Sequence, residues 1–155
     1  MRLTFLLDEN IIYHAIRGVD KHDNPDLTAQ ELVEAIARIC HGILVHSCVN
    51  ERYQTVFKKL REHPARSSAA IKFLAELLHN SSKRGYEFGD LPSLPSGVQL
   101  PREDEEIVRA ALISKPVVVT NDTDLKDAIN NHYEKLGLKA RDARGALELA
   151  ESEKP

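Results

Sequence analysis

The sequence is poor in residues that could cross-link a small fold through disulfides or soft metals. It has two cysteines, Cys40 and Cys48, whose spacing matches neither a CxxC pair nor a zinc motif. Its seven histidines form no HExxH pattern. We therefore expect no disulfide scaffold and no zinc site, and both cysteines should be reduced thiols in the core of a cytoplasmic protein. Cys48 also has no evident base beside it, so it is not expected to be a nucleophile.

Long hydrophobic runs are also missing. No apolar stretch approaches the roughly 20 residues that a membrane helix needs. The opening run stops at Asp8 and lacks a small-residue cleavage site, so it does not resemble a signal peptide. Seven glycines and 29% charged residues fit neither a fibrous repeat nor a disordered chain. We expect one domain over residues 1–155 and no membrane partner.

The charges are unevenly distributed, although the formal net charge is only −3. The segment 52–84 contains eight lysines and arginines and two glutamates, which gives it a net charge of +6 and leaves −9 on the rest of the chain. One surface could therefore attract a polyanion while another gathers carboxylates. A basic, solvated helix face would explain the segment equally well.

Short apolar runs alternate with segments of helical spacing along the chain. The expected strands are 3–7, 43–45, 117–120 and a weaker one at 138–140; the expected helices are 27–40, 47–62, 67–79, 103–114, 122–135 and 142–150. Residues 80–102, rich in proline and glycine, are expected to form a long loop. This alternation predicts an α/β fold, a three-layer α/β/α sandwich with a central parallel sheet.

Acidic residues follow two of the expected strands. Asp8 ends the first strand, and Asp122, with Asp124 close behind, follows the strand 117–120. The carboxyl ends of parallel strands share one edge of a sheet, where ligands bind in such folds, so Asp8 and Asp122 are expected to meet. Asp122 could instead serve only as a helix cap.

A third acid comes from the helix 103–114. At about 100° per residue, Asp104 falls near the centre of the apolar face set by Ile107, Val108 and Ala111, whereas Glu103 and Glu105 fall to its sides. Two carboxylates about 5 Å apart at an effective dielectric near 20 repel by roughly 3 kcal/mol, so converging acids need a cation. Oxygen ligands suit Mg²⁺ or Mn²⁺, which can activate water for phosphodiester hydrolysis.

These residues resemble the motifs of PIN-domain ribonucleases. The similar stretches are Leu6–Ile12, an apolar strand ending in Asp8 with Asn10 two further on; Asp104–Leu112; and Val117–Leu125, with Thr120, Asp122 and Asp124. The resemblance covers essentially the whole chain. It implies a Mg²⁺- or Mn²⁺-dependent endoribonuclease of single-stranded RNA. Two roles stay open, the toxin of a toxin–antitoxin pair with an antitoxin-like protein partner and a housekeeping nuclease, and a homodimer would be common for the family.

The resemblance also implies a role for each matching residue. Asp8, Asp104 and Asp122 would be metal ligands, Asp124 an accessory acid, and Asn10 and Thr120 would orient the acids or the attacking water. Glu51 matches the family's second acid by position, as a fourth ligand, although it lies off the apolar stripe of its helix. Glu9 departs from the family pattern and is expected to face solvent.

Two other hypotheses remain open. A catalytically degenerate PIN domain could act as an RNA-binding or protein-interaction module, and loss of the suspected glutamate would favour it. A phosphoacceptor signalling domain also gathers acids at strand ends, but it needs an acceptor aspartate after a central strand. The second strand runs into His46 and Ser47 instead.

Overall fold

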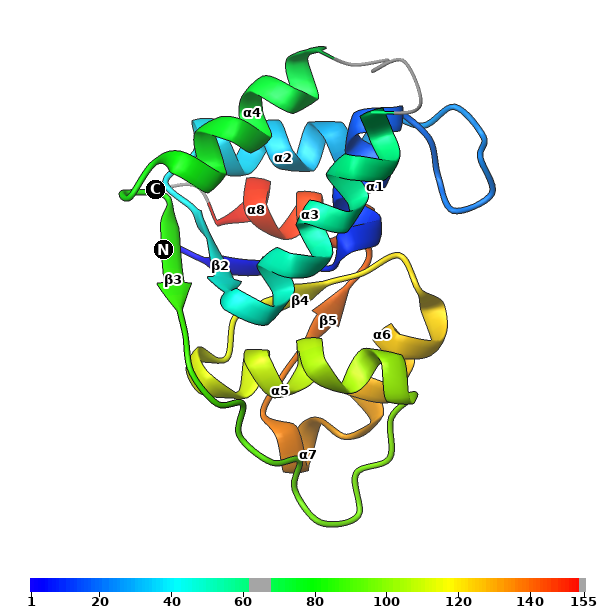
Figure 1. The fold of residues 1–155 in the computed structure, drawn as a ribbon, viewed down its shortest axis with the longest axis vertical. Helices are drawn as coiled ribbons and strands as arrows, with labels where there is room; N and C mark the ends of the chain where they lie inside the picture. The colour runs from blue at the N-terminus through cyan, green and yellow to red at the C-terminus, as the bar shows by residue number, and fades with distance from the viewer. Residues whose placement is uncertain (62–67, 154–155) are drawn as a thin grey trace.

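The computed structural model describes residues 1–61 and 68–153, and a parallel β-sheet forms its centre (Figure 1). The strands are β1 (Thr4–Leu7), β2 (Gly42–His46), β3 (Arg84–Glu87), β4 (Val117–Val119) and β5 (Ala140–Arg141). They lie in the order β3-β2-β1-β4-β5, and each neighbouring pair is parallel. The predicted α/β class with a central parallel sheet is therefore confirmed.

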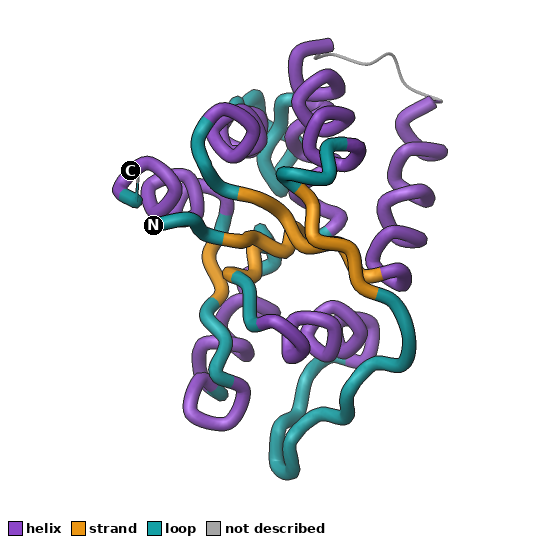
Figure 2. Tube along the Cα trace, turned by 90° about the vertical axis from the view of Figure 1, so that its left-hand side faces the viewer, coloured by secondary structure: helices purple, strands orange, loops and turns teal. Residues whose placement is uncertain are grey.

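Helices lie on both sides of the sheet (Figures 1 and 2). On one side are α1 (Glu9–Arg17), α2 (Thr28–Arg38), α3 (Ser47–Arg61), α4 (Ser68–His79) and α8 (Ala143–Ser152). On the other are the 3-10 turn η1 (Arg102–Asp104), α5 (Glu105–Ser114), α6 (Thr123–Asn131) and α7 (Tyr133–Leu136). This arrangement is compatible with the three layers that the sequence predicts.

The central strand β1 is buried on both faces. Phe5, Leu6 and Leu7 are fully buried, which explains why the strand reads as a continuous apolar run rather than an alternating one. Ile36 of α2 and Ile107 of α5 are fully buried as well. Each such side chain stabilises the fold by about 1.5–3 kcal/mol relative to an exposed one. The apolar run therefore fixes β1, and with it the position of Asp8, in the middle of the molecule.

The expected loop 80–102 is wrong in its first part, because Arg84–Glu87 forms the edge strand β3. Among residues 1–61 and 68–153 this strand pairs only with β2, and its sequence, RGYE, has no apolar pattern that would reveal it. The rest of the segment is tied to α5, since the Arg109 guanidinium donates to the carbonyls of Pro92 (2.7 Å) and Leu91 (3.1 Å). These bonds help to fix α5 and the Asp104 that precedes it.

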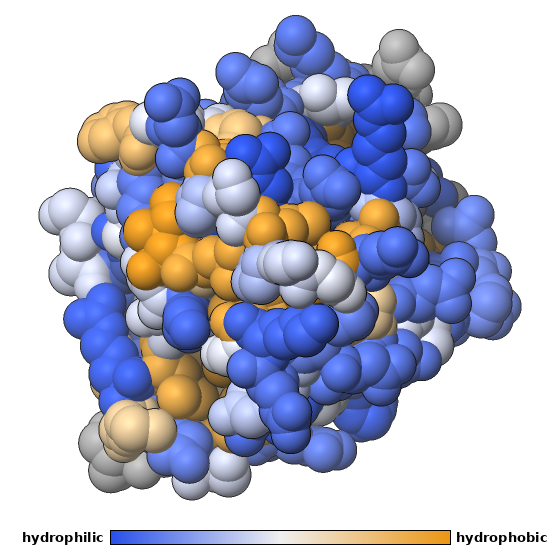
Figure 3. Space-filling model, turned by 90° about the horizontal axis from the view of Figure 1, so that it is seen from below, coloured by the Kyte–Doolittle hydropathy of each residue, from blue (hydrophilic) through white to orange (hydrophobic). Residues whose placement is uncertain are grey.

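The surface formed by the lower layer is mixed in character. Figure 3, a view from below, shows apolar side chains reaching the surface between hydrophilic ones. Ile113 of α5 and Tyr133 of α7 are about half exposed. Among residues 1–61 and 68–153, no helix combines the length and apolar character needed to cross a membrane. Within the basic segment 52–84, Glu62 and Arg66 lie outside the described residues, as does Ser67, where a helix was expected to start.

Candidate functional site

The ends of β1 and β4 bring the predicted residues to one edge of the sheet. Leu7 pairs with Val119 in register, and the Asp8 N–H donates to the Val119 carbonyl at 2.8 Å. Asp8 and Thr120 therefore leave neighbouring strands side by side. The chain order along the sheet reverses between these two strands, which is the usual place for a ligand in an open parallel sheet.

Asp8 is buried and held in place by hydrogen bonds. Its Oδ2 accepts from Thr120 Oγ1 at 2.7 Å and from Asn10 Nδ2 at 3.0 Å, and its Oδ1 accepts from the Glu9 N–H at 2.8 Å, which caps α1. Thr120, fully buried, accepts in turn from the Asp122 N–H at 3.1 Å. Thr120 thus links Asp8 and Asp122, the two acids that the sequence predicts to meet. Asn10, from α1, holds Asp8 in place through a second hydrogen bond.

Burial changes the protonation of Asp8. It raises the pKa of Asp8 to about 8; the hydrogen bond and charge of the Glu9 carboxylate add to the rise, and the bonds from Thr120 and the Glu9 N–H oppose it. Without a bound cation, the Asp8 carboxyl therefore keeps its proton near neutral pH. A cation close to Asp8 would favour the ionised form.

Asp122 and Asp104 form the outer part of this edge. Asp122 is exposed and caps α6, accepting from the N–H groups of Asp124 (3.0 Å) and Leu125 (3.2 Å). Asp104 lies in the 3-10 turn directly before α5, where the sequence predicted an α-helix from residue 103. Asp104 is half-buried, as is Glu105, while Glu103 is exposed. Burial raises the pKa of Asp104, and the charge of Asp122 raises it further. Asp104 and Asp122 are therefore close enough to repel each other.

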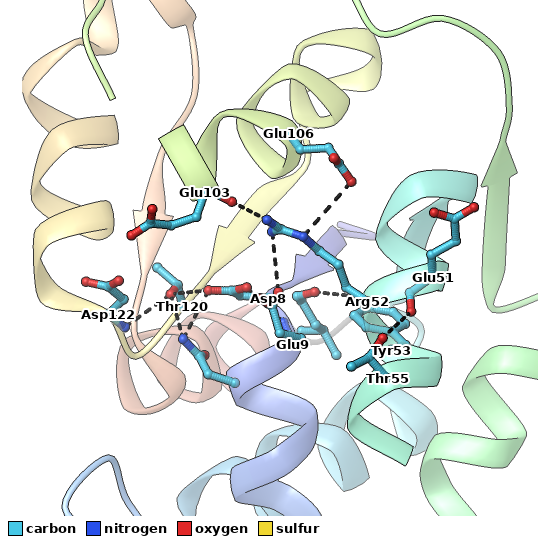
Figure 4. Close-up of polar contacts among 12 residues, drawn as sticks. Asp8, Glu9, Glu51, Arg52, Tyr53, Thr55, Glu103, Glu106, Thr120 and Asp122 are labelled. Atoms are coloured by element: carbon cyan, nitrogen blue, oxygen red, sulfur yellow. Dashed lines mark hydrogen bonds and ion pairs between the residues drawn. The ribbon is translucent and has the colours of Figure 1, made fainter. Parts of the chain in front are cut away.

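Two of the predicted acids stand apart from this group. The side chain of Asp124 is exposed, and its backbone N–H donates a hydrogen bond to Asp122 Oδ1. Glu51 is exposed on α3, and Figure 4 shows its carboxylate directed away from Asp8 and Asp122, on the far side of Arg52. Glu51 therefore does not lie among the acids at the sheet edge, where the fourth ligand was expected.

Arg52, which the sequence interpretation overlooked, enters the site in place of Glu51. Its Nη1 lies 3.6 Å from Glu9 Oε2, its Nε lies 4.0 Å from Glu106 Oε1, and its Nη2 donates to the Glu103 carbonyl (Figure 4). A signal existed in the sequence. On a helical wheel Arg52 lies about 70° from the buried stripe, whereas Glu51 lies about 170° from it.

Glu9 is half-buried, so the expectation that it faces solvent is wrong. Its side chain is 34% exposed and lies beside Asp8 and Arg52. Burial acts to raise the pKa of Glu9, but hydrogen bonds with Asp8 and with its own N–H, together with the charge of Arg52, outweigh burial and lower it. Glu9 is therefore a charged neighbour of the site.

Cys48 has a neighbouring base that the sequence did not reveal. Its Sγ lies 2.8 Å from Nδ1 of His46, which is 1% exposed at the end of β2. Burial and the negative charge of Glu106 raise the pKa of the Cys48 thiol. A thiol with a raised pKa is a poor nucleophile at neutral pH. This environment agrees with the expected inert role of Cys48. The expectation that Cys40 and Cys48 lie in the core is wrong, because both are free thiols that are only half-buried.

The donor atoms at this edge suit a hard divalent cation in kind, since they are carboxylate oxygens in surplus. Residues 1–61 and 68–153, however, contain no group of three acids, histidines or cysteines close enough to hold one ion by themselves. Mg²⁺ is commonly bound through one or two carboxylates, with waters and substrate phosphates filling its other positions. The acids of this edge could supply the one or two carboxylates of such a site, taken from Asp8, Asp104 and Asp122.

Comparison with known proteins gives no family. The chain matches no family model and no curated protein. The functional conclusion therefore depends on the geometry and chemistry of the sheet edge.

Proposed function

We propose that this protein is a PIN-like nuclease that hydrolyses phosphodiester bonds of single-stranded RNA with Mg²⁺ or Mn²⁺. One observation carries the proposal: the buried Asp8 is joined through Thr120 to Asp122, at the point where strand order reverses. Asp104, whose pKa the charge of Asp122 raises, adds a third acid. Helix capping would explain Asp122, and Asp8 caps α1 in the same way through Oδ1. Capping does not explain why Asp8 Oδ2 is buried and bonded to Thr120 and Asn10.

Each residue would have a distinct part in the reaction. The ion would take one or two protein ligands from Asp8, Asp104 and Asp122, with waters and substrate phosphate at its other positions. Asn10 and Thr120 would keep Asp8 in one orientation. In hydrolysis a water oxygen forms a new bond to phosphorus, an ester P–O bond breaks, and a proton from the water ends on the leaving oxygen. The bound ion would supply an acidified water and offset the charge that develops on the phosphate.

The test compares Asp8→Asn and Asp122→Asn with a charge-matched control, Asp127→Asn, an exposed acid on the same helix as Asp122. Mn²⁺-dependent cleavage of a labelled single-stranded RNA should fall by about 100-fold or more in the first two variants, because metal ligation is worth several kcal/mol. The control should retain full activity. Cleavage that survives excess chelator, or that is equal in all three variants, would refute the proposal.

A second function has one observation in its favour. Glu51 faces away and Arg52 faces in, so the edge holds a cationic side chain where a fourth acid was expected. A degenerate domain that binds RNA or a protein without cleaving it would tolerate this change. Such a domain would bind RNA equally well with and without Mn²⁺ and would show no cleavage. Under either function, binding of an antitoxin-like protein and assembly into a homodimer are predictions that the structure does not test.

A further inference from the structure

Arg52 is the cation that α3 directs into the acidic edge of the sheet. Its side chain is 23% exposed, and it contacts Glu9 of α1 and Glu106 of α5 as well as the carbonyl of Glu103. A guanidinium cannot lose its proton in a protein, so this positive charge is permanent. The acidic edge therefore carries a fixed cation of its own.

Arg52 is a counter-ion shared by the carboxylates of Glu9 and Glu106. Charge-assisted N–H to carboxylate hydrogen bonds are usually about 2.7–2.9 Å long. The two carboxylates of Glu9 and Glu106 lie farther away, at 3.6 and 4.0 Å. Arg52 Nη1 and Glu9 Oε2 are both buried without a hydrogen-bond partner in the described structure. The guanidinium therefore forms no short charge-assisted hydrogen bond with either acid.

The influence of Arg52 reaches a proposed metal ligand. Its Nη2 donates to the carbonyl of Glu103, the residue before Asp104, and its Nη1 lies 3.6 Å from the carboxylate of Glu9, the residue after Asp8. Part of the repulsion among the acids is therefore already offset without a metal. A divalent ion that binds here therefore gains less electrostatic binding free energy from these acids, and the guanidinium also repels it.

We propose that Arg52 replaces one divalent ion, so that the site takes up a single Mg²⁺ or Mn²⁺ ion and binds it more weakly than it would without Arg52. This inference rests on the proposed metal-dependent function. A purely structural salt bridge would hold α3 to α1 and α5 without changing metal affinity.

The test is titration of the full chain with Mn²⁺. Binding is measured by calorimetry and by the decrease of the free Mn²⁺ signal in electron paramagnetic resonance. The wild type should bind one ion. Arg52→Gln should bind Mn²⁺ about tenfold more tightly, because a unit positive charge near the ion is removed. Arg52→Lys keeps the charge and should stay close to wild type. Lys58→Gln removes the same charge from an exposed position on the same helix and should change little.

The outcomes separate this inference from the proposed function. Equal Mn²⁺ affinity in Arg52→Gln, Lys58→Gln and wild type would overturn the role of Arg52 alone, as would two ions bound to the wild type. No Mn²⁺ binding in any variant would overturn both the inference and the metal-dependent function. Circular dichroism of each variant checks folding. If Arg52→Gln fails to fold, the number of ions bound by the wild type still tests the inference, because two bound ions would overturn it.

Discussion

The two sides of the candidate site are built differently. On the β1–β4 side, Asp8 and Thr120 are almost completely buried and joined by hydrogen bonds of 2.7–3.2 Å that include Asn10. On the α3–α5 side, Arg52 reaches Glu9 and Glu106 over 3.6–4.0 Å, with the side chains 23–43% exposed. One side is a desolvated hydrogen-bond network, and the other is a set of longer ion pairs between partly exposed side chains.

This difference has energetic consequences. A buried polar group that loses its partner costs about 1–3 kcal/mol. An exposed ion pair is typically worth about 0–1 kcal/mol. We therefore expect substitutions on the β1–β4 side to alter both stability and activity, whereas substitutions on the α3–α5 side should mainly alter metal and ligand binding. The following predictions test this contrast, from the largest expected effect to the smallest.

Thr120→Val should have the largest effect on stability. It leaves Asp8 Oδ2 and the Asp122 N–H without their shared partner, so the free energy of unfolding should fall by about 1–3 kcal/mol in urea titrations. Metal-dependent cleavage should fall by about 10–100-fold, as when groups that orient metal ligands are removed. Thr55→Val removes an exposed hydroxyl from α3 and should leave both quantities unchanged. A stable, fully active Thr120→Val would contradict the contrast between the two sides.

The pH dependence of stability should report on Asp8. Its folded pKa, about 8, lies above the ordinary aspartate value of 3.8. The folded state therefore binds the proton more tightly, and the stability from this group is complete below about pH 4 and is lost as pH rises through about 8. In chelator, the melting temperature of the wild type should fall more steeply from pH 5 to pH 8 than that of Asp8→Asn. Parallel curves would show that Asp8 is not buried as described.

Tyr53→Phe should cause a smaller loss of stability. The Tyr53 hydroxyl, on a side chain 1% exposed, donates to the Leu7 carbonyl directly before Asp8. Loss of this bond should cost about 1 kcal/mol, equivalent to about 2–4 °C in melting temperature. Tyr133→Phe, at a half-exposed position, is the matched control and should melt with the wild type.

Glu51→Gln should have the smallest effect. Because Glu51 faces away from the acids, RNA cleavage and Mn²⁺ affinity should change by less than about threefold, which is within the usual range of a surface substitution. A loss as large as that of Asp8→Asn would instead support the sequence-based assignment of Glu51 as the fourth ligand.

Residues at strand ends could be predicted from sequence because apolar runs mark where strands stop. The run before Asp8 and the run before Thr120 locate both residues, and the parallel topology then puts them on one edge. Helix positions were harder to assign. Asp104 follows from a clear apolar stripe, but Glu51 was chosen by resemblance although Arg52 lies closer to the buried stripe. The strand β3 was missed because an edge strand needs little apolar character.

The amino-acid sequence determined the layered α/β plan and the positions at which its acids leave the strands, since both follow from local hydrophobic patterns. The tertiary structure decided which charges face one another across that edge. Burial raises the pKa of Asp8, and the packing of α3 against α1 and α5 turns Arg52 toward the acids. The helical wheel of α3 indicates which side of the helix carries Arg52. The partners of Arg52 and the pKa of Asp8 depend instead on desolvation and on distances between segments far apart in the chain, which no local pattern encodes.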